Sequence, residues 1–180
     1  GKYLFEVSSR YDGSVNFPSE TRWGFFPSAS LGWRVSEESF LKDNLPFVNN
    51  LKLRVSHGLL GYDPTSDPKS SIYGTYQYLA TYSVRSSYIY DNSNVLSSGI
   101  RADALPNTSI TWEKMYTTNA GFDFTLWNNM LEGSFDYFYR KRTDVLGART
   151  SSIPDIVGAN MPNVNYAAYD NRGWEVSLNH

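Results

Sequence analysis

The chain has 180 residues, which is long enough for one domain with a sizeable hydrophobic core. Its 16 Lys and Arg residues nearly balance 18 Asp and Glu residues, so it lacks the basic excess that nucleic-acid binding requires. It contains no Cys, which excludes disulfides, thiolate metal ligands and a cysteine nucleophile.

The aromatic content favours β-structure. Phe, Trp and Tyr make up 16% of the residues, yet the mean hydropathy is −0.45, so large apolar side chains are interleaved with polar ones. That mixture suits half-buried strands. The sequence has no run of about 18 apolar residues, which a membrane-spanning helix would need. Strand-like sequence begins at Lys2 without a signal peptide, so we expect a processed chain or a fragment.

The first part of the chain predicts three strands, because apolar and polar residues alternate along it. They cover residues 2–12, 23–35 and 50–60. Between the first two, the stretch "DGSVNFPSET" has the Gly, Pro and Asn content of a loop. After the second strand, Ser36 is expected to cap a single helical turn that ends before Pro46.

The second part predicts three more strands, over residues 109–127, 130–142 and 165–179. Residues 61–107 are rich in Tyr and alternate poorly, so we expect a long loop that contains one short hairpin. A two-residue connection at Asn128 and Asn129 is expected to join two strands, because Asn tolerates the positive φ of a tight turn. We therefore expect six antiparallel strands in one sheet, paired in sequence order.

The alternation leaves two environments open for the apolar face: the core of a soluble β-sandwich, or lipid around a membrane β-barrel. The strands over 109–127 and 130–142 exceed the ~5–6 residues typical of globular strands. Connections after the first, third and fifth strands are expected to be long and the others shorter, as in outer-membrane barrels. Two aromatic bands are also expected. Trp112, Tyr139 and Trp174 would lie toward the long loops, and Trp33 and Trp127 at the short turns.

The barrel interpretation gives the two faces of the sheet opposite environments. Toward lipid we expect Leu31, Leu53, Phe122, Phe124 and Phe135. Toward the lumen we expect Arg34, Arg54, Asp123, Glu132 and Asp136. Lys114, Asp170 and Arg172 share the apolar face, and we expect them near the loops because a charge at the bilayer midplane is costly.

Four blocks of the sequence also resemble a known family. They are "RWGFFPSASLGWRVSEESFL", "NLKLRVSHGLLG", "LPNTSITWEKMYTTNAGFDFTLWNNMLEGSFDYFYRKRTDVL" and "NRGWEVSLN", in this order along nearly the whole chain. They resemble the C-terminal half of the barrel in SusC/RagA-type TonB-dependent outer-membrane transporters. The chain is thus interpreted as all-β, a segment of an antiparallel up-and-down transmembrane β-barrel.

The resemblance implies a barrel of about 22 strands that encloses a plug domain and imports glycans or peptides into a bacterial cell. It implies four partners: outer-membrane lipid, a SusD-like surface lipoprotein, a glycan or peptide substrate, and the TonB complex, reached through a missing N-terminal part. Six strands cannot close such a barrel, so we expect the plug domain outside residues 1–180. The alternative is a soluble β-sandwich module that binds carbohydrate or acts as an adhesin.

No catalytic or metal-binding constellation is recognisable. His57 lacks metal-ligand spacing and a nearby nucleophile pattern, so it is interpreted as a wall residue. Glu132 and Asp136 are interpreted as wall charges rather than a catalytic pair. Asp63 and Asp67 are interpreted as part of a solvated loop rather than a cation site. We therefore expect no enzyme activity and no cofactor.

The tyrosine-rich loop is the one candidate recognition site. A Tyr ring offers a flat face and a hydrogen-bonding tip, which suits stacking on a sugar or packing on a partner protein. The other interpretation, that these rings only pack the loop against its neighbours, stays open. The candidates are Tyr73, Tyr76, Tyr78, Tyr82, Tyr88 and Tyr90.

Overall fold

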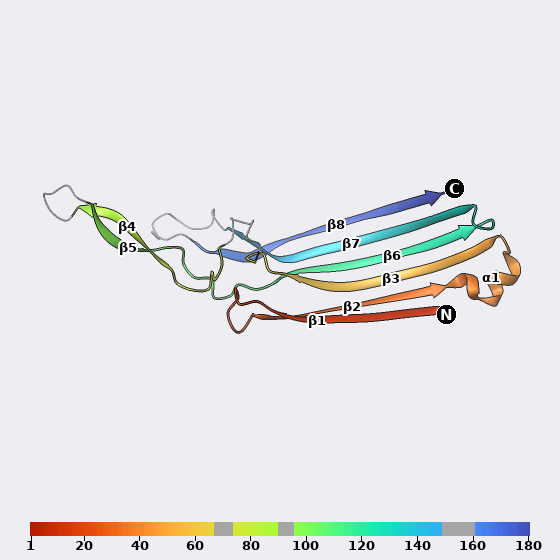
Figure 1. Ribbon diagram of the computed structural model, residues 1–180, viewed down its shortest axis with the longest axis horizontal. Coiled ribbons are helices and arrows are strands. Elements are labelled where there is room, and N and C mark those ends of the chain that lie inside the picture. Colours follow the sequence, from red (N-terminus) through yellow and green to blue (C-terminus); the bar gives the residue numbers. More distant parts are fainter. Residues whose placement is uncertain (67–73, 90–95, 149–160) are drawn as a thin grey trace.

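Six long strands form one antiparallel sheet in the computed structural model, which describes residues 1–66, 74–89, 96–148 and 161–180 (Figure 1). The strand order is β1-β2-β3-β6-β7-β8, so the predicted pairing in sequence order is confirmed. The strands are β1 (Tyr3–Gly13), β2 (Trp23–Arg34), β3 (Val48–Tyr62), β6 (Glu113–Leu126), β7 (Leu131–Ala148) and β8 (Asn163–Asn179). Because these strands make one sheet rather than two packed ones, the β-sandwich alternative is not favoured.

The register turns the alternation of each strand into two distinct faces. One row across the sheet joins Phe5, Leu31, Val55, Ala120, Tyr137 and Trp174. The next row joins Leu4, Gly32, Arg54, Gly121, Asp136 and Glu175. Since successive side chains point to opposite sides of a strand, these rows lie on opposite faces. We call them the apolar face and the polar face.

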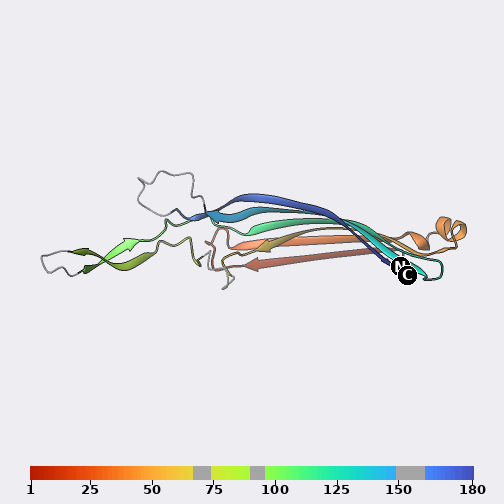
Figure 2. The ribbon, with the colours of Figure 1, turned by 90° about the horizontal axis from the view of Figure 1, so that it is seen from above.

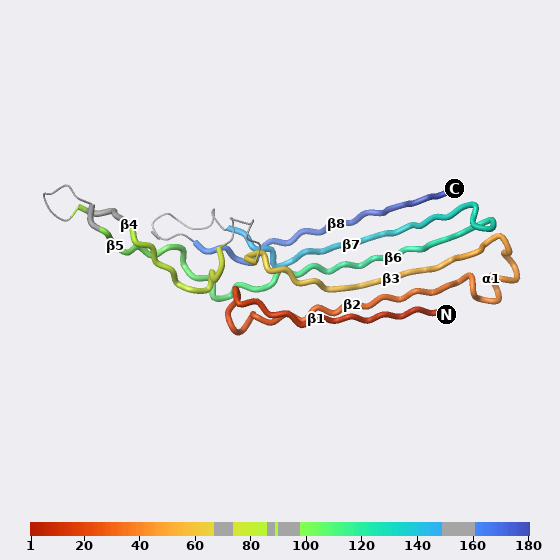
Figure 3. The backbone as a smooth tube through the Cα atoms, viewed as in Figure 1, coloured from red at the N-terminus to blue at the C-terminus, as the bar shows by residue number. Residues whose placement is uncertain are grey.

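The elongated sheet has two unlike ends (Figures 2 and 3). At the turn end lie both chain termini and the connections 35–47 and 127–130. At the loop end lie the connection 14–22, the C-terminal ends of β3 and β7, and the N-terminal ends of β6 and β8. The connection 35–47 is longer than 14–22, so the expected long-short alternation is wrong for the first two connections.

The connection 35–47 is long because it contains two short helices, η1 (Val35–Glu37) and α1 (Ser39–Asn44). The N-cap of α1 is Glu38, so the cap predicted at Ser36 is wrong. Among the described residues, neither these helices nor any other is long and apolar enough to cross a bilayer.

The connection between β6 and β7 is larger than the two-residue turn expected. It spans 127–130, and Trp127, Asn128 and Asn129 have φ values of 51°, 53° and 68°. The Asn residues tolerate this left-handed backbone as predicted. Trp127 adopts it as well, and its N–H donates to the Phe47 carbonyl at 2.9 Å in the neighbouring connection.

Two strand boundaries also differ from the prediction. β7 continues to Ala148 rather than ending at 142, because a bulge at Asp144, with φ of 57°, interrupts the alternation without ending the pairing. β6 begins at Glu113 rather than at 109, because Ile110 and Trp112 leave the sheet for a buried cluster at the loop end.

The predicted hairpin within 61–107 is present as β4 (Tyr82–Ile89) and β5 (Leu96–Ala102). It forms a two-stranded sheet of its own and projects beyond the loop end (Figures 1 and 2). At its base the Asp103 N–H donates to the Thr81 carbonyl at 3.0 Å, so the two ends of the hairpin lie side by side.

Candidate functional site

An ion-pair network on the polar face joins three strands. Nη2 of Arg54 on β3 lies 2.8 Å from Oδ1 of Asp123 on β6 and 3.1 Å from Oδ2 of Asp136 on β7. Gly121 pairs with both Arg54 and Asp136 in the register. A Cβ at Gly121 would overlap the Asp136 carboxylate, so the missing side chain allows Arg54 to reach over β6.

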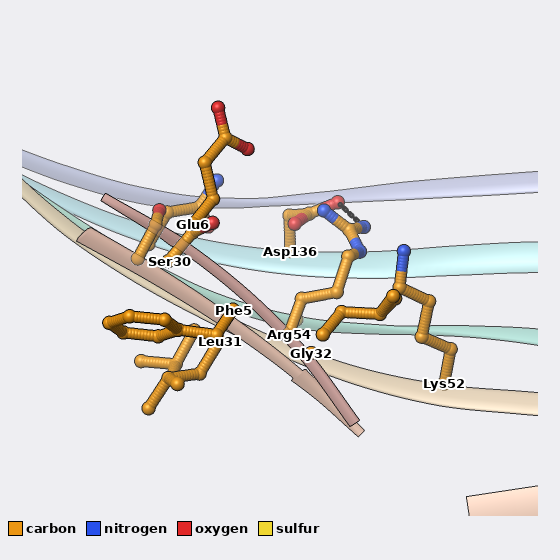
Figure 4. A pocket seen from close by; sticks show the side chains of 13 residues that line it. Phe5, Glu6, Ser30, Leu31, Gly32, Lys52, Arg54 and Asp136 are labelled. Atoms are coloured by element: carbon orange, nitrogen blue, oxygen red, sulfur yellow. Dashed lines mark hydrogen bonds and ion pairs between the residues drawn. The ribbon is translucent and has the colours of Figure 1, made fainter. Parts of the chain in front are cut away.

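This network borders a groove of about 460 Å³ (Figure 4). Its polar lining includes Glu6, Ser30, Lys52, Arg54, Asn119 and Asp136. Figure 4 shows Phe5 and Leu31 directed away from these charges, on the other side of the strands. Mixed charges of this kind hydrate a polar solute. Within the described ranges, no group of His, Asp and Glu is arranged to hold a metal ion.

Three polar atoms beside the groove are buried without a hydrogen-bond partner among the described residues. They are Nε of Arg54, Oδ1 of Asn119 and Oδ1 of Asp136. Buried polar atoms are nearly always paired in complete proteins, through the protein or through ordered water. The wall of the groove therefore contains one donor and two acceptors that have no partner among the described residues.

The apolar face is open to the surroundings over its whole width. Phe5 at one edge is 72% exposed and Trp174 at the other is 69% exposed. The five residues predicted for this face, from Leu31 to Phe135, share it, and the five predicted for the polar face share that one. A chain in water would hide such a surface, so this face requires an apolar environment.

Stacked aromatic pairs mark both ends of the apolar face on β1 and β2. Tyr11 stacks on Trp23 at the loop end with ring centroids 5.2 Å apart, and Tyr3 stacks on Trp33 at the turn end at 6.5 Å. The position of Trp33 is as predicted, whereas the Tyr11–Trp23 pair was missed. Trp174 lies nearer the Asn179 end of β8, so its predicted place toward the loops is wrong.

Glu38 binds both rings of the aromatic pair at the turn end through hydrogen bonds. Its carboxylate accepts hydrogen bonds from the Tyr3 hydroxyl at 2.9 Å, Nε1 of Trp33 at 3.2 Å and Nζ of Lys2 at 3.1 Å. These hydrogen bonds hold the pKa of Glu38 below its ordinary value. The bond from Tyr3 has the largest effect, followed by those from Trp33 and Lys2. The role of Glu38 was not foreseen, since nothing in its local sequence shows which strands it would meet.

A buried cluster fills the loop end where β2 parts from β3, beyond their last pair Ser28–Gly58. Its members are Phe17, Phe26, Ile110, Trp112 and Leu146. The Trp112 ring packs edge-on against Phe17 and Phe26, and its Nε1 donates to the Arg22 carbonyl at 3.1 Å. Trp112 therefore lies at the loop end as predicted, but it is buried in this cluster and does not join an aromatic band on the apolar face.

Asp63 is buried beside this cluster rather than solvated, which corrects the prediction for its loop. Its carboxylate accepts hydrogen bonds from Ser14 at 2.6 Å, Asn16 at 3.0 Å and both the backbone N–H and hydroxyl of Thr65. Burial raises the pKa of Asp63, but hydrogen bonds from Ser14, Thr65 and Asn16 outweigh burial and leave the pKa below its ordinary value. Asp67 lies outside the described residues.

The three candidate tyrosines whose side chains the structure describes have different surroundings. Tyr78 is half-buried against the loop-end cluster, and its hydroxyl donates to the Val15 carbonyl at 3.4 Å. Tyr76 borders a groove of about 240 Å³ between residues 74–81 and 161–163, and Tyr82 on β4 is 66% exposed. Tyr73, Tyr90 and the side chain of Tyr88 lie outside the described residues.

Polar residues also occur on the apolar face, and not all of them lie near the loops. His57 is a wall residue on β3, and its Nδ1 is 2.8 Å from the Thr118 hydroxyl. Lys114 pairs with Asp144 at 3.1 Å close to the loops, where the N-terminal end of β6 meets the bulge of β7. Asp170 lies in the half of β8 nearer the loop end, whereas Arg172 lies in the half nearer Asn179, so the prediction that Arg172 lies near the loops is wrong.

Comparison with known proteins assigns the sheet to a family. A family model described as "TonB dependent receptor-like, beta-barrel" matches residues 1–180. The chain belongs to the TonB-dependent receptor β-barrel family. It is a segment of SusC/RagA type, as its sequence blocks implied. The barrel is not closed by these strands alone.

Curated relatives of this family match nearly the whole chain. TonB-dependent receptor SusC of Bacteroides thetaiotaomicron is 36% identical over 99% of the chain, which spans 17% of SusC. TonB-dependent receptor P39 of Formosa agariphila is 34% identical over 98% of the chain, which spans 15% of that protein. The chain thus covers less than a fifth of each.

Solved structures of RagAB share the fold of the sheet. The RagAB peptide importer in the "open-open" state has a TM-score of 0.77 and 24% identity, and the match covers 98% of this chain and 17% of that one. Its "closed-closed" state has a TM-score of 0.75 over 98% of this chain and 18% of that one. In a barrel of this family the polar face is the inner face and the apolar face is the outer face.

Proposed function

We propose that the full-length protein imports a bulky nutrient through the bacterial outer membrane, and that residues 1–180 supply wall and outer loops. The observation that carries the proposal is the separation of an exposed, largely apolar face from a charged inner face over six strands. Strands of this length can cross a bilayer at a tilt. The turn end then faces the periplasm and the loop end faces outside the cell.

The solute is proposed to be a glycan or a peptide that passes without chemical change. A wide lumen lined by charges of both signs, Ser and Asn hydrates such a solute without holding it tightly. The proposed plug domain and the contact with the TonB complex lie outside residues 1–180. Similarity to SusC and to the RagAB peptide importer supports this class of transport without identifying the substrate.

The projecting hairpin is proposed to contact a SusD-like surface lipoprotein or the incoming solute. Tyr82, Val84 and Ile100 form an exposed apolar stripe on one side of β4 and β5, while Ser83, Arg85 and Arg101 lie on the other. A lone two-stranded hairpin is marginally stable in water. An apolar stripe on such a hairpin is therefore suited to packing against a partner.

Removing the hairpin tests this role. Because Thr81 and Asp103 are hydrogen-bonded neighbours, a Gly-Ser link between them can replace residues 82–102 without straining the loop base. Cells that carry this variant at normal surface levels should lose uptake or lipoprotein binding while the barrel stays folded. Unchanged uptake and unchanged lipoprotein binding would contradict the role of the hairpin.

A matched pair of point variants separates the two sides of the hairpin. Val84→Asp with Ile100→Asp places charges on the apolar stripe, whereas Ser83→Asp with Gly99→Asp places the same charges on the other side. Only the first pair should weaken lipoprotein binding or uptake. An equal loss with both pairs would indicate a general effect on the hairpin rather than docking through the stripe.

A further inference from the structure

The turn end carries a group of exposed apolar side chains that the strand faces do not explain. We call this group the ledge; its members are Phe40, Leu45, Phe47, Trp127 and Met130, and all are exposed. Phe40 is 56% exposed and Met130 is 63% exposed. Turn residues are usually small or polar, so large apolar groups in two separate connections call for an apolar environment.

Direct contacts join the two connections into one unit. Phe47 stacks on Trp127 with ring centroids 6.3 Å apart, and the Trp127 N–H donates to the Phe47 carbonyl at 2.9 Å. The Asn128 N–H donates to Oδ1 of Asn49 at 2.7 Å. The ledge is therefore one surface formed by the β2–β3 connection and the β6–β7 connection together, rather than two independent turns.

The contacts of Glu38 place the start of α1 beside the outer face. Its carboxylate is held by Tyr3 and Trp33, both of which belong to that face. Residues two apart in sequence lie about 200° apart around a helix, so Phe40 and Lys42 lie on nearly opposite sides of α1. Such a helix at a membrane interface can direct Phe40 toward lipid while the charge of Lys42 stays in water.

We propose that the ledge is an anchor at the headgroup boundary of the periplasmic leaflet, with lipid as its occupant. The proposal rests on the proposed function, because it requires the outer face to lie in lipid. The ledge continues that face without a break: Val48, next to Phe47, pairs with Leu126, next to Trp127. Trp and Phe rings at such a boundary keep their apolar bodies in lipid and their polar edges near water.

Site-directed spin labelling tests the proposal, since residues 1–180 contain no native Cys. A cysteine-free full-length transporter is labelled at Phe40→Cys and placed in vesicles of phosphatidylethanolamine and phosphatidylglycerol. Collision rates with oxygen, which concentrates in lipid, are compared with those of a water-soluble nickel complex. Lys42→Cys serves as the aqueous control on the opposite side of the same helix, and Leu31→Cys as the lipid control on β2. Retention of the folded band in unheated gel samples verifies each labelled protein.

We expect an oxygen-to-nickel ratio at Phe40 several-fold above that at Lys42 and below that at Leu31. Trp127→Cys should give the same intermediate value from the other connection. An aqueous ratio at Phe40 with a lipid ratio at Leu31 would overturn the ledge as an anchor and leave the proposed function standing. An aqueous ratio at Leu31 would overturn the proposed function itself. Shielding of Phe40 from both reagents would indicate protein contact and also overturn the lipid assignment.

Discussion

Arg54 and Asp136 form an ion pair across a strand that lies between them, with 3.1 Å from Nη2 to Oδ2. β3 and β7 each pair with β6 and not with each other, so the two side chains meet only by passing over Gly121. The same guanidinium also pairs with Asp123 on β6. One arginine thus ties three strands of the inner wall together.

The variant Gly121→Ala should destabilise the barrel by about 1–3 kcal/mol, because its Cβ would overlap Asp136 and the Phe135 carbonyl. The measurement is chemical unfolding of the full-length protein in detergent. Gly32→Ala is the control in the same row, where the nearest atom is the flexible Cε of Lys52 at 3.3 Å. Equal stability of the two variants would contradict the account of the Arg54–Asp136 contact.

Acid should loosen the loop end through Asp63. Its pKa in the folded protein is below the ordinary value of 3.8, so its carboxylate stabilises the fold above that pH. This contribution is lost as the pH falls through the folded pKa. Hydrogen exchange of residues 14–22, corrected for intrinsic rates, should therefore show less protection at pH 3 than at pH 7.

Asp63→Asn provides the matched control for the acid effect. An amide at this position brings an N–H group toward the donors of Ser14, Asn16 or Thr65, so protection should already be low at pH 7. It should change little between pH 7 and pH 3. If the variant were as protected as the parent protein at pH 7, Asp63 would not organise the loop end.

Two candidate tyrosines should behave differently when replaced. Tyr78→Ala removes a ring that packs on the loop-end cluster, so it should lower hydrogen-exchange protection around Phe17 and Ile110. Tyr82→Ala removes an exposed ring and should leave that protection unchanged while weakening uptake or lipoprotein binding. The opposite assignment of effects would show that Tyr82, and not Tyr78, has the packing role.

Alternation was sufficient to predict the sheet, because period-two patterns are local and persist along each strand. Leu31, Arg54, Phe122 and Asp136 were all assigned to the faces that the register gives them. Even the hairpin within 61–107 was foreseen from its weak pattern. The resemblance of the blocks around Trp33 and Trp127 supplied the family, which alternation alone left open.

The loop end could not be predicted in the same way, because its contacts join residues far apart in the chain. Trp112 follows the even spacing of the outer face, yet the strand begins only at Glu113 and the indole turns into the cluster with Phe17 and Phe26. Asp63 reads as a solvated loop residue until its partners Ser14 and Asn16 are known. No local sequence signal indicates that Trp112 packs on Phe17 and Phe26, or that Asp63 binds Ser14 and Asn16.

Asp144 explains the underestimated length of β7 in similar terms. The sequence "RTDVL" breaks the alternation, which predicts the end of a strand. A single bulge with positive φ at Asp144 absorbs the extra residue, and pairing with β8 resumes at Val145. Sequence alternation does not distinguish such a bulge from a true strand end.

The most direct test of a lipid-facing wall is the comparison of Phe124→Lys with Thr125→Lys in the full-length protein. These neighbours lie on opposite faces of β6, and Thr125 pairs with Glu132, which could accept the new charge. Phe124→Lys should cost ~2–4 kcal/mol if it lies near the bilayer midplane, with a smaller effect nearer an interface. The measurement is the amount of folded transporter at the cell surface, checked by the unfolding free energy in vesicles. We expect a clear loss for Phe124→Lys and near-normal levels for Thr125→Lys. Equal tolerance of lysine at both positions would contradict a membrane wall.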